Sequence, residues 1–121
     1  MCRKTSLLLL SAVLVLMSGA TAPGQGQRER ESRGQGVLSA NCSRCHAIGL
    51  AGQSTHREAP PFRTLGQRYP IEALAEALAE GLSSGHPDMP EFRFEVEDVD
   101  AILAYLKSIQ DKERGVPPAA R

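Results

Sequence analysis

The sequence predicts an all-α fold of three main helices joined by long irregular loops. Apolar residues recur at three- and four-residue intervals over 96–110, which is the spacing of one face of an α-helix. A second helix is predicted over 70–80, between a proline and a glycine, and a shorter one over 33–41. No strand pattern surrounds residues 42–46, where two cysteines lie.

The first 20 residues have the pattern of a secretory signal peptide. Arg3 and Lys4 form a short basic region, and an apolar core of 11 residues follows at 7–17. This core is well short of the roughly 20 residues that span a bilayer, so we expect a cleaved signal and no membrane anchor. We place the cleavage after Ala20, and the small residues before Ala22 make that position the alternative.

The segment between the signal and the first predicted helix is polar. Residues 21–32 are rich in Gly, Gln, Arg and Glu, so we expect a flexible lead-in, with Ser32 capping a helix from about Arg33 to Asn41. Gly34 and Gly36 each weaken that helix by up to about 1 kcal/mol relative to alanine. Close approach of another helix would explain them, and a frayed first turn is the alternative.

The stretch with the most specific chemistry is Cys42-Ser43-Arg44-Cys45-His46. Two thiols three residues apart, followed directly by an imidazole, form the signature for covalent attachment of a c-type haem. This spacing brings both sulfurs to one side of the backbone, where they can meet two vinyl groups, and His46 can then bind the iron from one face. We therefore predict one covalent haem c, attached through Cys42 and Cys45.

Two other readings of these thiols are less consistent with the sequence. A structural zinc site needs a second pair of ligands, and no other cysteine remains once the signal peptide is removed. A thioredoxin-like redox pair needs a βαβ context, which is missing here.

Residues 47–69 form an irregular stretch rich in Gly, Pro, Arg and Ser, which is too long for an ordinary connection. We expect it to wrap the haem edge, with Phe62 and Leu65 covering the ring. Three of its arginines could neutralise the haem propionates or simply face solvent: Arg57, Arg63 and Arg68.

The helix predicted over 70–80 carries Leu74 and Leu78 four residues apart. Gly81 is a typical helix end. We expect this helix to serve only as scaffold.

The loop over 81–94 carries Met89, the one methionine outside the predicted signal peptide. A lone methionine is ordinarily core filler. Here Pro87 and Pro90 stiffen the backbone on both sides, in a chain that already has a haem motif, so we predict Met89 as the second axial ligand of the iron. His86 in the same loop and His56 in the preceding stretch are the alternatives.

The last predicted helix, over 96–110, has acidic residues in its first turns and Lys107 near its end, as the helix dipole favours. Residues 111–121 include two prolines and are expected to form a flexible tail. The apolar face of the helix is made by Val99, Ile102, Leu103, Leu106 and Ile109.

Composition limits the partners and the core. Cleavage after Ala20 leaves one domain of 101 residues (121 − 20), with 12 basic side chains (14 − 2) against 14 acidic ones. Nucleic-acid-binding domains are usually basic, so we expect no nucleic-acid partner. With 4% aromatic residues and no tryptophan the core is thin, and we expect the haem to supply much of its apolar surface.

On these residues the chain resembles the class I cytochrome c family, small soluble bacterial monohaem proteins, over about 33–110. Gly34 and Leu38 stand eight and four residues before Cys42, as in the first helix of that family, and the run 101–107 is similar to its last helix. The resemblance implies that these two helices cross at nearly right angles, with Gly34 in close contact near Tyr105.

The resemblance also implies roles for single residues. A proline after the attachment site offers its carbonyl to the proximal histidine, and Pro60 is similar to that residue, with Pro61 as the alternative. The Pro-Asp-Met-Pro sequence fits the sixth-ligand loop of the family at Met89. One departure is that no tyrosine or tryptophan stands in the segment where family members often bond a propionate.

With His46 and Met89 on opposite faces the iron has no open position, so we expect single-electron transfer and no enzymatic activity. The resemblance and the signal pattern imply a monomeric periplasmic carrier without stable membrane insertion, whose redox partners dock transiently at the haem edge. Two alternatives stay open. One is a cytochrome subunit of a specific dehydrogenase or oxidase complex, and the other is a haem enzyme or gas sensor with a labile sixth site.

Overall fold

The computed structural model describes residues 23–81 and 88–113, so the signal-peptide prediction and His86 lie outside the described residues. The described chain is all helix and loop, without a strand, as predicted. Its elements are α1 (Pro23–Asn41), the 3-10 helices η1 (Phe62–Gln67) and η2 (Ile71–Ala73), α2 (Leu74–Glu80) and α3 (Val96–Glu113). No helix within these residues has the length and apolar character needed to cross a membrane.

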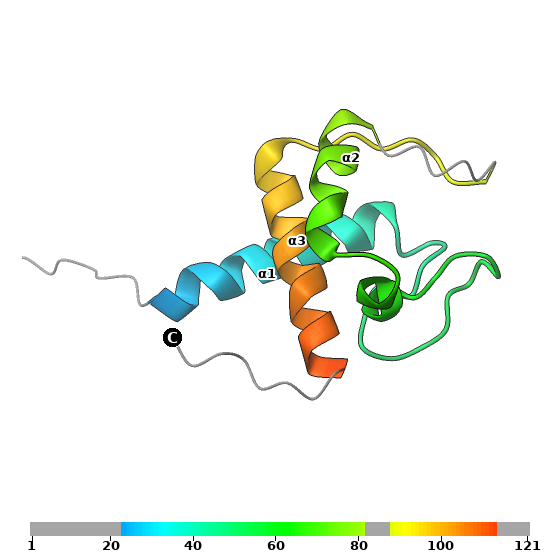
Figure 1. The fold of residues 1–121 in the computed structure, drawn as a ribbon, viewed down its shortest axis with the longest axis horizontal. Coiled ribbons are helices and arrows are strands. Elements are labelled where there is room, and N and C mark those ends of the chain that lie inside the picture. Colours follow the sequence, from blue (N-terminus) through cyan, green and yellow to red (C-terminus); the bar gives the residue numbers. More distant parts are fainter. Residues whose placement is uncertain (1–22, 82–87, 114–121) are drawn as a thin grey trace, which may run out of the picture.

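The centre of the fold is the crossing of α1 over α3 (Figure 1). At Gly34 a Cβ atom would lie 2.5 Å from the carbonyl carbon of Ala101, and closer still to its oxygen, so no side chain fits there. The close contact expected for Gly34 is therefore present, one turn before Tyr105. At Gly36 a Cβ would meet no described atom within 4 Å, so close approach does not explain the second glycine.

Helix α1 begins at Pro23, whereas a start at about Arg33 with Ser32 as its cap was predicted. Residues 23–32, expected to be a flexible lead-in, are helical, and this half of α1 extends beyond the crossing (Figure 1). The absence of an apolar face was the basis of the wrong prediction. A segment without an apolar face can still be helical, but it packs against little of the rest of the protein.

Contacts one helical turn apart support this polar half of α1. The Gln27 Nε2 donates to Glu31 Oε1 at 2.8 Å, and Arg30 Nη2 donates to Gln27 Oε1 at 2.9 Å. Pairs at this spacing stabilise a helix by a few tenths of a kcal/mol each. Proline at the first position costs the helix no hydrogen bond.

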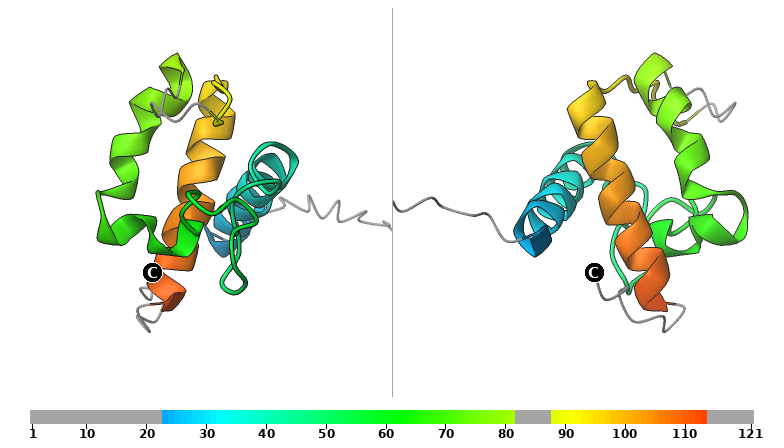
Figure 2. Two further views of the ribbon diagram at one scale, coloured as in Figure 1. Left: turned by 90° about the vertical axis from the view of Figure 1, so that its right-hand side faces the viewer. Right: turned by 60° about the vertical axis from the view of Figure 1, so that its left-hand side comes forward.

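The other helices pack on α3 and form the core with it. α2 lies alongside the first half of α3 in both further views (Figure 2). At the outer surface Lys107 donates to Glu72 Oε1 at 2.9 Å, and this hydrogen bond holds the pKa of Glu72 below its ordinary value. The buried apolar residues are Leu38, Phe62, Leu65, Ile71, Leu78, Val99, Ala101, Ile102, Tyr105, Leu106 and Ile109.

The ends of the later helices differ slightly from the prediction. The first turn of the helix predicted over 70–80 is the 3-10 helix η2, and Gly81 follows α2 with a φ of +125°, a conformation that side chains rarely adopt. Helix α3 continues to Glu113, so residues 111–113 of the expected flexible tail are helical. Residues 114–121 lie outside the described range.

Tyr105 ties α3 to the segment that follows His46. Its hydroxyl donates to the carbonyl oxygen of Ile48 at 3.1 Å, and burial raises the pKa of this phenol. We expect Tyr105→Phe to lower the free energy of unfolding by about 1 kcal/mol, because the Ile48 carbonyl loses its donor. Urea denaturation of the two proteins, followed by circular dichroism, measures the difference. Equal denaturation midpoints would show that this hydrogen bond contributes nothing.

Candidate functional site

The two cysteines and the histidine are brought together by the turn that ends α1. The backbone N–H of Cys42 donates to Leu38 O at 2.8 Å, continuing the helical pattern, and the N–H of His46 donates to Cys42 O at 2.9 Å. This single turn places the side chains of Cys42, Cys45 and His46 on one cavity. Both thiols are free and half-buried.

The cavity has a volume of about 460 Å³, within the roughly 300–1,000 Å³ typical of cofactor sites. Met89 lines it together with the two thiols and the imidazoles of His46 and His56, so one cavity holds two imidazoles, a thioether and two thiols. Most of its remaining wall is apolar and is built by Leu38, Phe62, Leu65, Leu74, Leu78, Phe92, Phe94, Ile102 and Leu106.

These side chains fit a haem better than a bare metal ion. An imidazole and a thioether are a ligand pair used by haem iron, and apolar walls suit the faces of a macrocycle. Among residues 23–81 and 88–113 no group of three or more His, Cys, Asp or Glu side chains gathers where it could hold a metal ion. A zinc site needs such a group.

The orientation of His46 is fixed from two sides. Its Nδ1 lies 2.9 Å from the carbonyl oxygen of Pro60, and its ring packs on Phe62 with the centroids 4.6 Å apart. A carbonyl only accepts, so Nδ1 carries the proton and Nε2 is left as the nitrogen with a free lone pair. The carbonyl of Pro61, the alternative partner, instead accepts from the Thr64 hydroxyl at 2.8 Å.

The Met89 segment is held along α2. The N–H of Phe94 donates to Leu78 O at 2.9 Å, and the Arg93 guanidinium donates to Glu80 O at 2.6 Å through Nη2. Phe92 and Phe94 stack with their centroids 6.0 Å apart. These contacts anchor the chain just after Met89, whose side chain is half-buried.

The environment of Cys42 works against a reactive thiolate. Burial raises the pKa of the Cys42 thiol to about 11, and the neighbouring Cys45 adds to the shift. Redox-active cysteine pairs carry a thiol whose pKa is lowered, so that a thiolate forms near neutral pH. The opposite shift at Cys42 argues against the thioredoxin-like reading.

Comparison with known families identifies the kind of protein. The family model described as Cytochrome c matches residues 31–110. The chain belongs to the cytochrome c family. Searches of curated proteins and of solved structures returned no match. Cytochrome c proteins are generally electron carriers, and the family implies a covalently bound c-type haem, so the domain supports haem-based electron transfer.

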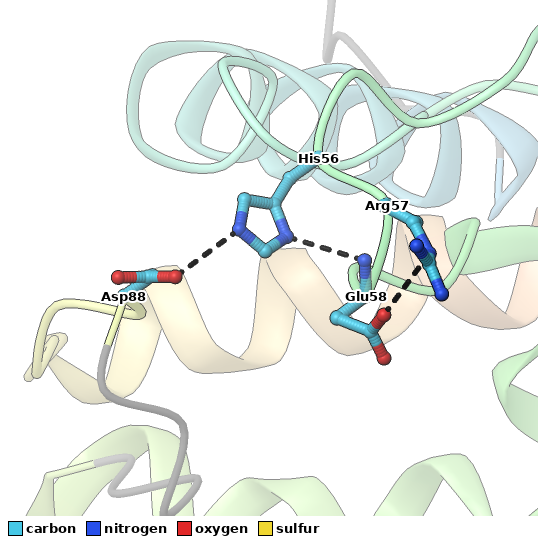
Figure 3. Close-up of polar contacts among 4 residues, drawn as sticks. All are labelled: His56, Arg57, Glu58 and Asp88. Carbon is cyan, nitrogen blue, oxygen red and sulfur yellow. Dashed lines mark hydrogen bonds and ion pairs between the residues drawn. The ribbon is translucent and has the colours of Figure 1, made fainter.

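His56, the alternative ligand to a cytochrome iron, already uses both ring nitrogens. Its Nδ1 accepts from the N–H of Glu58 at 3.3 Å, and its Nε2 lies 3.4 Å from Asp88 Oδ2 (Figure 3). Arg57 pairs with Glu58 at 3.5 Å and is almost fully exposed. His56 would have to give up one of these contacts to bind iron. Its contact with Asp88 links the loop after the attachment site to the residue before Met89.

Several cavity residues were not singled out by the sequence. Leu74 and Leu78 line the cavity, so the expectation that their helix is scaffold alone was wrong. Tyr69 lines it as well, and no sequence signal distinguished this tyrosine. Amphipathic spacing shows that a residue faces inward, but it does not show whether it faces another helix or a cofactor.

The arginine that borders the cavity is not one of the three considered in 47–69. Arg44 lines the described cavity, whereas Arg57, Arg63 and Arg68 do not. Arg44 stands between the two cysteines, so its position in the motif was the available signal.

Proposed function

We propose that this protein is a class I, bacterial type of cytochrome c that carries one electron on a single haem c, attached through Cys42 and Cys45. In this proposal His46 and Met89 are the axial ligands, and Pro60 orients His46. The observation that carries it is that both thiols, the His46 imidazole and the Met89 thioether line one mostly apolar cavity, while His56, which also lines it, makes contacts through both ring nitrogens.

The proposed ligand set determines what the site does. The haem supplies the redox chemistry, a single-electron change at iron. A six-coordinate iron leaves no position for a substrate, and the soft thioether of Met89 favours the reduced ion, so a relatively high potential follows. The hydrogen bond between His46 Nδ1 and Pro60 O fixes the imidazole, so that Nε2 would be free to bind a haem iron and would be the stronger donor for this bond.

The cellular setting is part of the same proposal. The basic and apolar N-terminal pattern supports export to the periplasm, where the protein works as a monomer. Redox proteins dock transiently near Cys42 and Cys45, through a small interface, and leave after the electron has passed. The neighbouring Ser43 and Arg44 are exposed and available for such contacts.

Met89→Ala tests the ligand set. Sulfur bound to ferric iron gives a weak absorption band in the red, and we expect this band in the wild type and its complete loss in the variant. The reduced variant should also bind carbon monoxide near neutral pH, because the sixth position is open. Visible spectra of both oxidation states measure both effects.

His56→Ala and His86→Ala are the matched controls. Each should keep the red band and exclude carbon monoxide. If Met89→Ala changes neither property while one of the histidine variants opens the iron, that histidine is the ligand and the proposal is wrong.

A further inference from the structure

Gln110 is a buried polar side chain that the haem cavity does not use. It lies near the end of α3, is 4% exposed, and is not among the residues that line the cavity. Its carboxamide bonds to both ends of η1: Nε2 donates to Phe62 O at 2.5 Å, and Oε1 accepts from the Gly66 N–H at 3.1 Å. The backbone of η1 is therefore attached to α3 through one side chain.

The glycine in η1 leaves room for this contact. A Cβ at Gly66 would lie 3.1 Å from Gln110 Oε1 and 3.3 Å from its Cγ, tighter than an ordinary contact. Any side chain at 66 would therefore displace the carboxamide by a few tenths of an ångström.

The start of η1 is also the support of His46. Pro60 O lies 2.9 Å from His46 Nδ1, the Phe62 ring packs on the imidazole, and the Phe62 N–H donates to Ala47 O at 2.9 Å. The segment 60–62 thus contacts His46 on one side and Gln110 on the other. The carbonyl that Gln110 binds is therefore two residues along the chain from the carbonyl that His46 binds.

We propose that Gln110 is a positioning residue for the proximal histidine. By fixing 60–62, it keeps the Pro60 carbonyl in line with the Nδ1–H of His46, and so sets the donor strength of His46 and the reduction potential of the iron. This inference rests on the proposed function, since it requires His46 to be an iron ligand.

The hydrogen bond between His46 and Pro60 determines in which direction the reduction potential should change. A strong Nδ1–H bond to Pro60 makes the imidazole a better donor, which stabilises ferric iron. Gln110→Met keeps the length of the side chain and removes its hydrogen bonds to Phe62 and Gly66. The hydrogen bond between His46 and Pro60 should then weaken, which stabilises the ferrous form relative to the ferric form. We expect the ferrous-to-ferric ratio at a fixed redox poise to rise roughly threefold to tenfold, where tenfold is about 59 mV for one electron.

The test uses the haem-loaded protein and two readouts. Spectroelectrochemical titration gives the ferrous-to-ferric ratio, and proton NMR of the ferrous form gives the rate at which the Nδ1 proton of His46 exchanges with water. Gln110→Met should raise the ratio and speed the exchange. Gly66→Ala should change the ratio and the exchange rate in the same direction, but by less. If Gln110→Met yields no folded holoprotein, the result for Gly66→Ala tests the proposal instead.

Val99→Ala is the matched control. Val99 is a buried residue in the first turn of α3, at the opposite end of the helix from Gln110, and it does not line the described cavity. Val99→Ala should lower the free energy of unfolding but leave the ferrous-to-ferric ratio and the exchange rate of the His46 Nδ1 proton unchanged.

The outcomes separate this inference from the proposed function. If the wild type carries a haem with the expected ligand spectrum, and the Gln110 and Gly66 variants lose stability with an unchanged ratio and exchange rate, Gln110 is only structural and the inference is overturned. A wild type whose haem is not bound by His46 overturns the proposed function, and the inference with it.

Discussion

Gly34→Ala is expected to destabilise the folded holoprotein by about 3 kcal/mol or more, at the upper end of what overpacking costs. The added methyl group would meet the backbone of Ala101, at 2.5 Å from its carbonyl carbon. A backbone cannot rotate away as a flexible side chain can, so α1 and α3 must separate. Separation would also loosen the pairing of Arg33 with Asp98, 2.8 Å apart.

Gly36→Ala is the matched control, because it changes the same helix by the same atom. A Cβ at Gly36 meets no described atom within 4 Å, so this variant should gain up to about 1 kcal/mol from helix propensity. Urea denaturation of the three holoproteins measures both changes. Equal effects at the two positions would show that the crossing does not depend on Gly34.

Removal of the haem is expected to unfold most of the chain. Six buried core residues also line the cavity and would lose the contacts that the haem supplies: Leu38, Phe62, Leu65, Leu78, Ile102 and Leu106. Burial of such a side chain is worth about 1.5–3 kcal/mol, so exposing six of them to water costs on the order of 10 kcal/mol. That is as large as the whole stability of a typical domain, about 5–15 kcal/mol.

The double variant Cys42→Ala, Cys45→Ala, purified free of pigment, provides the haem-free chain. Its far-ultraviolet circular dichroism should show little helix, and heating should give no sharp transition, because binding and folding are coupled. Native-like helical content with a cooperative thermal transition would contradict this expectation and would show that the polypeptide has a sufficient core of its own.

The elements that the sequence predicted well are those with a local signal. The stripe from Val99 to Ile109 defines one face of α3 whatever it packs against, and those two residues are buried as expected. The order Cys42, Cys45, His46 depends only on spacing within one turn. These residues, together with Met89, line one cavity in the structure.

The features that the sequence did not predict depend on contacts between distant segments. The polar half of α1 has no apolar pattern, so its helix could not be read from periodicity, and the prediction placed its start at Arg33 instead of Pro23. Gln110 stands near the end of an apolar stripe and looks like a surface residue in sequence. Only the tertiary approach of η1 gives it the two hydrogen bonds that explain its burial.

Intact mass spectrometry of the purified protein under denaturing conditions tests the central claim most directly. We predict a polypeptide that has lost its signal peptide and carries the mass of one haem through denaturation, because thioether bonds at Cys42 and Cys45 hold it. A colourless protein of bare polypeptide mass, with Cys42 and Cys45 as free thiols or as a disulfide, would contradict the account.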